Sequence, residues 1–403
     1  MNILWIITTQ WRAQACGYAG NQDVTTPALD VLARRSIDVT QAVTPHPFGP
    51  FARAALLTGV MSPENGVRDY FDPLPSHART VAGALNERDY RTAFFGKWHL
   101  STRDPGAPLV GEAHARTIVP PESRGGFGFW EGFESGFQLN DPWLHGTRLP
   151  TPVRVPGYQS DVLARRAAEW VTETGATRPW FCVVSLEPPH PPYDQAPRAQ
   201  AARYSPDQLH LPPNVPRGGA TEARARKELA GYYAHISATD RAIGELLSRI
   251  DESTTAVFFT SVHGDMHGAH GLFRKGWPYE ESVRVPLLIR LPGGSGERSD
   301  RAVSLVELPR LTVTLADKGT LSDLGSAWSS ISMPSVVKLP DQCDRIWRGL
   351  RSPRRKLIVN RDGSPWLFFD MEKDPGERQN LVGNPAYEAE IQKWRERLAA
   401  TGD

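Results

Sequence analysis

The chain has 403 residues, which is too long for a single small domain. Hydrophobic residues make up 40% of it, enough to form a large core. Its 46 Lys and Arg side chains are balanced by 45 Asp and Glu, so no overall charge favours nucleic acid or an acidic membrane as a partner. The three cysteines are widely spaced and odd in number, which argues against a disulfide framework and against a metal–thiolate cluster.

The first apolar run, residues 2–7, is far shorter than the roughly 20 residues that a membrane helix needs. The residues around it show neither a basic leader nor a small-residue cleavage site. We therefore expect a soluble, cytoplasmic protein with no membrane or nucleic-acid partner, and a homo-oligomer remains open.

Short apolar runs that end abruptly in polar or Gly/Pro-rich loops predict buried strands of a parallel sheet. Four such runs occupy residues 2–7, 92–95, 180–186 and 255–261. Helical patterns lie between them at residues 26–36, 80–89, 160–174 and 225–250. This alternation predicts an α/β fold with a large, mostly parallel sheet and helices on both faces.

Residues 44–60 combine a Pro/Gly-rich approach with an Ala/Leu helix that contains Arg53. Free N–H groups and the positive end of the helix dipole at such a start attract sulfate or phosphate. However, Gly49, Pro50, Phe51 and Ala52 carry no hydroxyl or thiol that could attack a bound anion.

Ligands of open α/β sheets collect beyond the carboxyl ends of the strands. Five side chains with catalytic potential follow the four predicted strands directly. We expect one pocket to contain Thr9, Lys97, His99, His190 and His263.

Two Pro-, Gly- and aromatic-rich stretches, residues 103–137 and 191–220, are expected to be surface excursions that shape a cleft mouth. Within the first, Trp130 and Phe133 could line that mouth or only anchor the loop.

The helix and strand pattern weakens after residue 320. A hairpin across residues 361–364 and a terminal helix over 385–401 follow. We predict a main domain of residues 1–320 and a small α+β subdomain of residues 321–403.

Seven stretches, in this order, resemble the type I sulfatases of the alkaline phosphatase superfamily. They are residues 26–43, 53–67, 94–100, 124–134, 188–193, 263–293 and 368–381. The resemblance implies the fold of that superfamily; shared fold alone does not decide chemistry.

By this resemblance, the family's formylglycine nucleophile would fall on Gly49. Its metal-binding carboxylates would fall on Thr9 and Val262, with Gln10 and His263 beside them. A hard cation such as calcium prefers six to eight oxygen ligands, many of them anionic. We therefore expect no metal and no cofactor in this pocket.

The resemblance also implies that the groups contacting sulfate and its leaving group are retained. These are Arg53, Lys97, His99, His190 and Lys275. Because a buried carboxylate without its metal is costly, metal and ligands would be lost together, leaving a cationic pocket for an anionic small molecule.

Additional histidines lie close to the same motifs, and neutral imidazole can act as acid or base near physiological pH. We assign Lys97, His99, His190 and His263 as catalytic candidates. The substrate-binding candidates are Thr9, Arg53, Lys275, His46, His267 and His270.

Ordinary structural roles remain open for these histidines, and His99, His263, His267 and His270 could instead recruit zinc. Cys16 or Thr9 could be a displaced nucleophile, although a small buried cysteine is usually only packed. Asp265 could be catalytic or could cap a turn.

Three functions follow from these assignments. The pattern of bases without nucleophile or metal favours a metal-independent enzyme that moves protons on an anionic substrate, as a lyase, cyclase or isomerase does. The alternatives are an inactive pseudosulfatase that binds a ligand or partner, and a residual sulfate or phosphate ester hydrolase.

Overall fold

Four buried strands form the centre of the large sheet in this computed structural model, which describes residues 1–175, 177–321 and 324–401. They are β1 (Asn2–Thr8), β3 (Arg91–Lys97), β7 (Trp180–Ser185) and β8 (Thr255–Ser261). β1 pairs in parallel with both β7 and β8, and β3 pairs in parallel with β7. The expected α/β fold with a mostly parallel sheet is confirmed.

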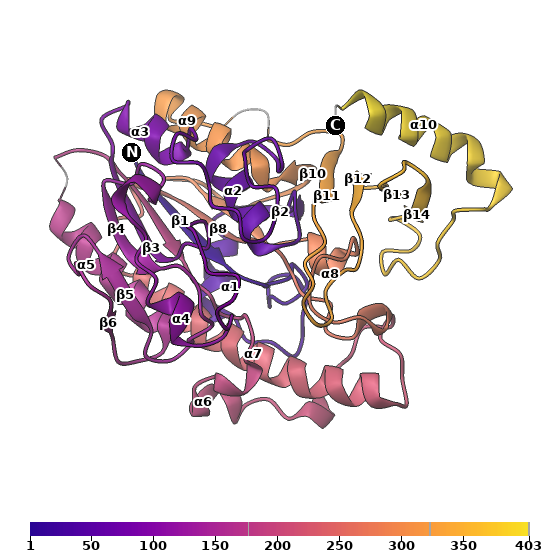
Figure 1. Cartoon of the computed structure of the whole chain (residues 1–403), viewed down its shortest axis with the longest axis horizontal. Coiled ribbons are helices and arrows are strands. Elements are labelled where there is room, and N and C mark those ends of the chain that lie inside the picture. Colours follow the sequence, from indigo (N-terminus) through magenta and orange to yellow (C-terminus); the bar gives the residue numbers. More distant parts are fainter. Residues whose placement is uncertain (176, 322–323, 402–403) are drawn as a thin grey trace.

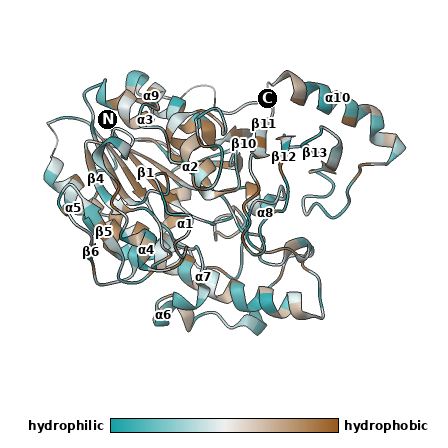
Figure 2. Cartoon of the chain, viewed as in Figure 1, coloured by the Kyte–Doolittle hydropathy of each residue, from teal (hydrophilic) through white to brown (hydrophobic). Residues whose placement is uncertain are grey.

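Alternate side chains of β1 enter two separate hydrophobic cores. Ile3, Trp5 and Ile7 belong to one core, and Leu4 and Ile6 belong to the other. Because both faces are covered, the strand is apolar at nearly every position, as the sequence of a central parallel strand should be. Figure 2 shows these central strands as hydrophobic and the outer helices as mixed.

Six further strands extend this sheet on both sides among the described residues. They are β2 (Ile37–Val43), β9 (Leu287–Arg290), β10 (Glu297–Ser304), β4 (Phe129–Phe133), β5 (Trp143–Gly146) and β6 (Val153–Arg154). The full strand order is β10-β2-β9-β8-β1-β7-β3-β4-β5-β6.

The expectation that residues 103–137 form only a surface excursion is wrong at its end. β4 lies in this stretch and pairs with β3. Trp130 is fully buried and stacks on Phe94 at 5.9 Å between ring centroids, so neither it nor the buried Phe133 shapes a cleft mouth.

Helices cover both faces of the sheet (Figure 1). One core contains residues of α2 (Gly49–Thr58), α3 (Val81–Asn86) and α9 (Leu308–Lys318), whereas the other contains residues of α1 (Pro27–Ala33), α5 (Gln159–Thr174) and α7 (Ala220–Leu247). The short helices are α4 (Glu112–Ala115), α6 (Arg198–Ala201) and α8 (Glu280–Val283). None of the described helices is both long and apolar enough to span a bilayer.

A second, four-stranded antiparallel sheet follows, drawn in orange to yellow in Figure 1. Its strands are β11 (Ser329–Met333), β12 (Trp347–Arg351), β13 (Arg355–Asn360) and β14 (Pro365–Asp370), and α10 (Glu388–Ala400) packs on it. The expected hairpin turn at 361–364 joins β13 to β14. Cys16, Cys182 and Cys343 are free and buried.

Candidate functional site

The carboxyl ends of the central strands surround one cavity. Thr9 follows β1, Lys97 ends β3 with His99 just beyond it, and His190 and His263 follow β7 and β8. All five side chains line a cavity of 270 Å³, together with Gly49 and Lys275. The chain therefore brings these residues together as the α/β topology predicts.

Lys275 is the cation most directly presented to this cavity. Its Nζ donates a hydrogen bond of 2.6 Å to Oε1 of Gln10 and lies 3.3 Å from Nε2 of His190. The amide of Gln10 is oriented by a second hydrogen bond, from its Nε2 to Asp265. Burial lowers the pKa of Lys275 to about 7.

Lys97 reaches the same cavity, but its charge is compensated. Its Nζ lies 2.5 Å from Oε1 of Glu187, and both side chains are buried. Burial lowers the pKa of Lys97 and the Glu187 carboxylate raises it in part. No sequence pattern singled out Glu187, although this residue directly follows the strand predicted at 180–186.

Arg53 lies beneath the cavity and does not line it. Its guanidinium donates to Thr9 Oγ1 at 2.8 Å, to Ser185 Oγ at 2.6 Å and to the carbonyl oxygen of Lys97 at 3.0 Å. Burial lowers the pKa of Arg53 to about 10. Arg53 thus holds the ends of β1, β3 and β7 together and adds positive charge below the cavity floor.

His99 faces the start of α2. Its Nδ1 is buried without a hydrogen-bond partner among the described residues, and a Cβ added at Gly49 would stand 3.0 Å from it. On its other side, Nε2 lies 2.8 Å from a nitrogen of Arg103. Burial, followed by the charge of Arg103, holds the pKa of His99 well below its usual value, so the ring is neutral.

His190 and His263 are also neutral, because burial and the nearby charge of Lys275 lower both pKa values strongly. Nδ1 of His263 lies 2.9 Å from the carbonyl oxygen of Gly264, which places the proton there. Its Nε2 is then unprotonated, buried, and without a hydrogen-bond partner in the described part of the chain. His263 can therefore accept a proton from a molecule in the cavity.

The cavity lining does not include three of the predicted histidines. His46 accepts from the Ser62 N–H at 2.9 Å, and burial lowers its pKa to about 4. His267 packs between tyrosines, with its ring centroid 4.2 Å from that of Tyr232. His270 stacks on Tyr279 at 4.1 Å, near the second sheet.

Zinc ligation by His99, His263, His267 and His270 is not supported by this arrangement, because only the first two line the cavity. A different group, His270 with Glu281 and Glu377, has ligand atoms within 4.8 Å of one another. Its carboxylates already pair, Glu281 with Asn214 at 2.8 Å and Glu377 with Lys356 at 2.6 Å.

The residues that the sulfatase resemblance implies as metal ligands do not suit a calcium ion in this structure. The Thr9 hydroxyl donates to Leu186 O at 3.1 Å and accepts from Arg53, and Val262 is a buried apolar side chain. Gln10 Oε1 faces the ammonium of Lys275. A hard dication prefers six to eight oxygen ligands, many of them anionic, whereas here the nearby carboxylate of Asp265 accepts a hydrogen bond from the Gln10 amide and the Lys275 ammonium occupies the other side of that amide.

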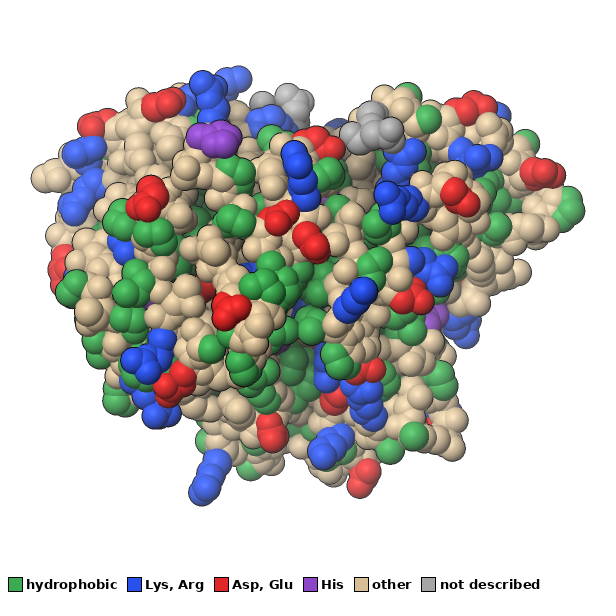
Figure 3. Space-filling model, in the orientation of Figure 1, with side chains coloured by type: hydrophobic (Ala, Val, Ile, Leu, Met, Phe, Trp, Pro, Cys, Tyr) green, Lys and Arg blue, Asp and Glu red, His purple; other side chains and the backbone are tan. Residues whose placement is uncertain are grey.

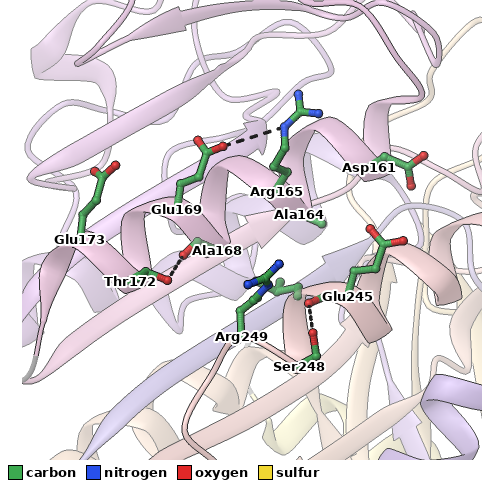
Figure 4. Close-up of a pocket in the computed structure, with 11 residues that line it drawn as sticks. Asp161, Ala164, Arg165, Ala168, Glu169, Thr172, Glu173, Glu245, Ser248 and Arg249 are labelled. Atoms are coloured by element: carbon green, nitrogen blue, oxygen red, sulfur yellow. Dashed lines mark hydrogen bonds and ion pairs between the residues drawn. The ribbon is translucent and has the colours of Figure 1, made fainter.

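A larger hollow, of 630 Å³, lies between α5 and α7 (Figure 4). Its exposed rim carries charges of both signs that pair with each other or with neighbours, such as Arg165 with Glu169 and Asp161 with Arg241. Exposed ion pairs of this kind contribute little, and the hollow presents no convergent set of buried polar groups.

Comparisons with known proteins place these residues in a family. The Sulfatase family model matches residues 1–317. The chain is 32% identical to an ulvan-active sulfatase of Formosa agariphila, covering 100% of this chain and 82% of that protein. It is 25% identical to an arylsulfatase of Clostridium perfringens, covering 98% of this chain and 93% of that protein.

A solved structure bound to its substrate, D-glucosamine-2-N,6-O-disulfate, superposes with a TM-score of 0.85. The two chains are 20% identical, and the match covers 99% of this chain and 97% of that one. At this identity the likeness supports the fold.

The expectation of a lyase, cyclase or isomerase is wrong. It relied on the number of histidines near the pocket, whereas relatives matched over nearly the whole chain are named sulfatases. The structure also places His46, His267 and His270 outside the cavity lining. The family model and the full-length relatives show that this chain belongs to the sulfatase family of the alkaline phosphatase superfamily.

Proposed function

We propose that this chain binds the sulfate group of a small sulfated molecule, without a metal ion, in the cavity at the carboxyl ends of β1, β3, β7 and β8. The observation that carries the proposal is the position of Lys275. Its buried ammonium faces the cavity between the side-chain oxygen of Gln10 and the ring of His190.

Charge balance supports this proposal. Lys97 is neutralised by Glu187, so Lys275 and the underlying Arg53 provide the positive charge that a sulfate monoanion would offset. Charge-assisted hydrogen bonds from a buried ammonium are about twice as strong as neutral ones. The backbone N–H groups at the start of α2, beside Gly49, would supply further donors.

Hydrolysis of the bound ester is the second candidate, and the names of the full-length relatives favour it. Gly49 offers no attacking atom, so the nucleophile would be water. In that reaction Nε2 of His263 accepts a proton from water, the new S–O bond forms, and the ester S–O bond breaks. The departing alkoxide takes a proton from the ammonium of Lys97, giving an alcohol and sulfate.

Calorimetric titration with inorganic sulfate and with 4-nitrophenyl sulfate, in chelator-treated protein, tests both candidates. We expect both ligands to bind, and calcium to leave their affinities unchanged. Release of 4-nitrophenol above the rate of a Lys275→Met variant would support hydrolysis. Binding without release would support recognition alone, and calcium-dependent binding would contradict the metal-free site.

A further inference from the structure

The outer part of the cavity differs in chemistry from its floor. Apolar side chains from four separate segments form the mouth: Leu109, Val110, Phe137, Pro191, Leu339 and Pro340. Val110 is 63% exposed, which is high for a large aliphatic side chain. Figure 3 shows hydrophobic side chains gathering around a hollow between the positions of α4 and α8 in Figure 1.

The polar side chains at this mouth are already engaged by the protein. The carboxylate of Asp341 accepts from Arg224 at 2.7 Å, and the guanidinium of Arg274 donates to Glu228 at 2.7 Å. Oε1 of Gln342 accepts from the backbone N–H of Lys275 at 3.3 Å. A ligand hydroxyl entering the mouth would therefore find few free partners.

Phe137 connects the mouth to the floor. Its ring stacks on His190 with 4.5 Å between centroids and an interplanar angle of 8°. Nζ of Lys97 lies 4.7 Å from the same ring centroid. The backbone of Phe137 is left-handed, with φ of 55°, so the loop geometry holds this ring at the cavity.

We infer that the pocket selects sulfate monoesters of apolar alcohols or phenols over sulfated sugars. This inference rests on the proposed sulfate-binding function and names the class of molecule attached to the sulfate. An apolar body would cover Leu109, Val110 and Leu339 and gain from their burial. A sugar would instead lose water from several hydroxyls without replacing those hydrogen bonds.

The volume of the cavity agrees with a small ligand. At 270 Å³ it lies just below the range of about 300–1,000 Å³ that is usual for small-molecule pockets. One sulfate group and a single ring or a short alkyl chain can be accommodated there.

Calorimetric titration with inorganic sulfate, phenyl sulfate and glucose 6-sulfate tests the inference. We expect phenyl sulfate to bind about tenfold more tightly than inorganic sulfate. Glucose 6-sulfate should bind no more tightly than inorganic sulfate. Equal or tighter binding of glucose 6-sulfate relative to phenyl sulfate would overturn the inference while leaving sulfate binding intact. Failure of all three to bind would overturn the proposed function and this inference together.

A variant locates the effect at the mouth. Val110→Asn should weaken phenyl sulfate binding and leave inorganic sulfate binding unchanged. The substitution alters only the part of the cavity mouth that would contact the phenyl ring. Val31→Asn is the matched control, since Val31 is 51% exposed on α1 outside the cavity lining. Equal binding of phenyl sulfate by wild type and Val110→Asn would contradict the inference.

Discussion

Two lysines reach the same cavity, but their surroundings give them different roles. Lys97 has a carboxylate at 2.5 Å, whereas Lys275 faces the neutral Gln10 amide and His190. A buried cation without a paired carboxylate attracts an anion most strongly. We therefore assign anion binding chiefly to Lys275.

Lys275→Met should weaken the binding of inorganic sulfate by about tenfold or more, because one charge-assisted hydrogen bond is lost. The pKa of Lys275 is about 7, so the charged form prevails below this pH. Wild-type affinity should fall as pH rises from 6 to 8, and the variant should lack this dependence. Calorimetric titration at several pH values measures both effects, and a variant that retains the wild-type pH dependence would contradict the assignment.

Glu187→Gln should lower the free energy of unfolding by about 3 kcal/mol, because the buried Lys97 loses its carboxylate. The double variant Lys97→Met with Glu187→Gln should be less destabilised, since no charge is then left uncompensated. Denaturant unfolding measures these differences, with Glu169→Gln on the surface of α5 as the matched control. An unchanged midpoint for Glu187→Gln would show that the pair is not formed.

At the scale of elements, β3 must approach β7 closely just before Lys97. Gly96 has φ of 101°, and a Cβ at this position would stand 2.2 Å from the carbonyl oxygen of Ser185. Ser185 in turn accepts from Arg53 and donates to Lys97 O. The glycine therefore allows the two strands to meet where the site begins.

Gly96→Ala should destabilise the protein severely, because both the backbone conformation and the contact with a neighbouring strand oppose a side chain. Gly363→Ala is a useful comparison, since Gly363 has φ of 80° but nothing within 4 Å of its added Cβ. Thermal unfolding of both variants separates the cost of the backbone conformation from the cost of the steric clash with β7. Equal shifts in Tm would mean that strand contact adds nothing to the cost.

For the whole molecule, buried charges join the second sheet to α8. Nζ of Lys356 on β13 lies 2.8 Å from Glu280 and 2.6 Å from Glu377, and Arg351 on β12 lies 2.8 Å from Glu280. Glu280 belongs to α8, in the loop region that also carries Lys275. The attachment of the second sheet is thus coupled to the shape of the cavity.

Lys356→Met should cost about 3 kcal/mol of stability, because two buried carboxylates lose their shared cation. Glu377→Gln should cost far less at pH 7, since burial raises the pKa of Glu377 to about 7 and the group is already partly neutral. Because burial raises the pKa of Glu377, the folded protein holds a proton there that is lost as pH rises towards 7, and stability falls with it. The wild type should therefore lose more stability over this range than Glu377→Gln, which still contains Glu134 and Asp240, two buried carboxyls with pKa values raised to about 7. Urea unfolding from pH 5 to 8 tests this, with exposed Lys393→Met as the control.

The sequence could predict the central strands because their two-sided burial leaves long apolar runs, as in β1 and β8. It also indicated which strand ends carry Thr9, Lys97, His99, His190 and His263. It missed the six other described strands of the large sheet. The edge strand β10 is mostly polar over residues 297–301, and β4 is a short run interrupted by Glu131 and Gly132, so neither carries a long apolar pattern. The number of histidines near the sequence motifs did not predict which histidines line the cavity, because His46 and His267 are buried outside its lining.

The sequence by itself determined the α/β class, the family resemblance and the absence of a nucleophilic side chain at Gly49, because these depend on local residue order. Only the tertiary structure decided which charged side chains at the cavity are paired with an opposite charge. Glu187 meets Lys97 across 90 positions of sequence and Gln10 meets Lys275 across 265, and such pairings leave no local signal. The electrostatics of the pocket follow from these long-range contacts, since a buried charge is governed by the few groups within hydrogen-bond reach.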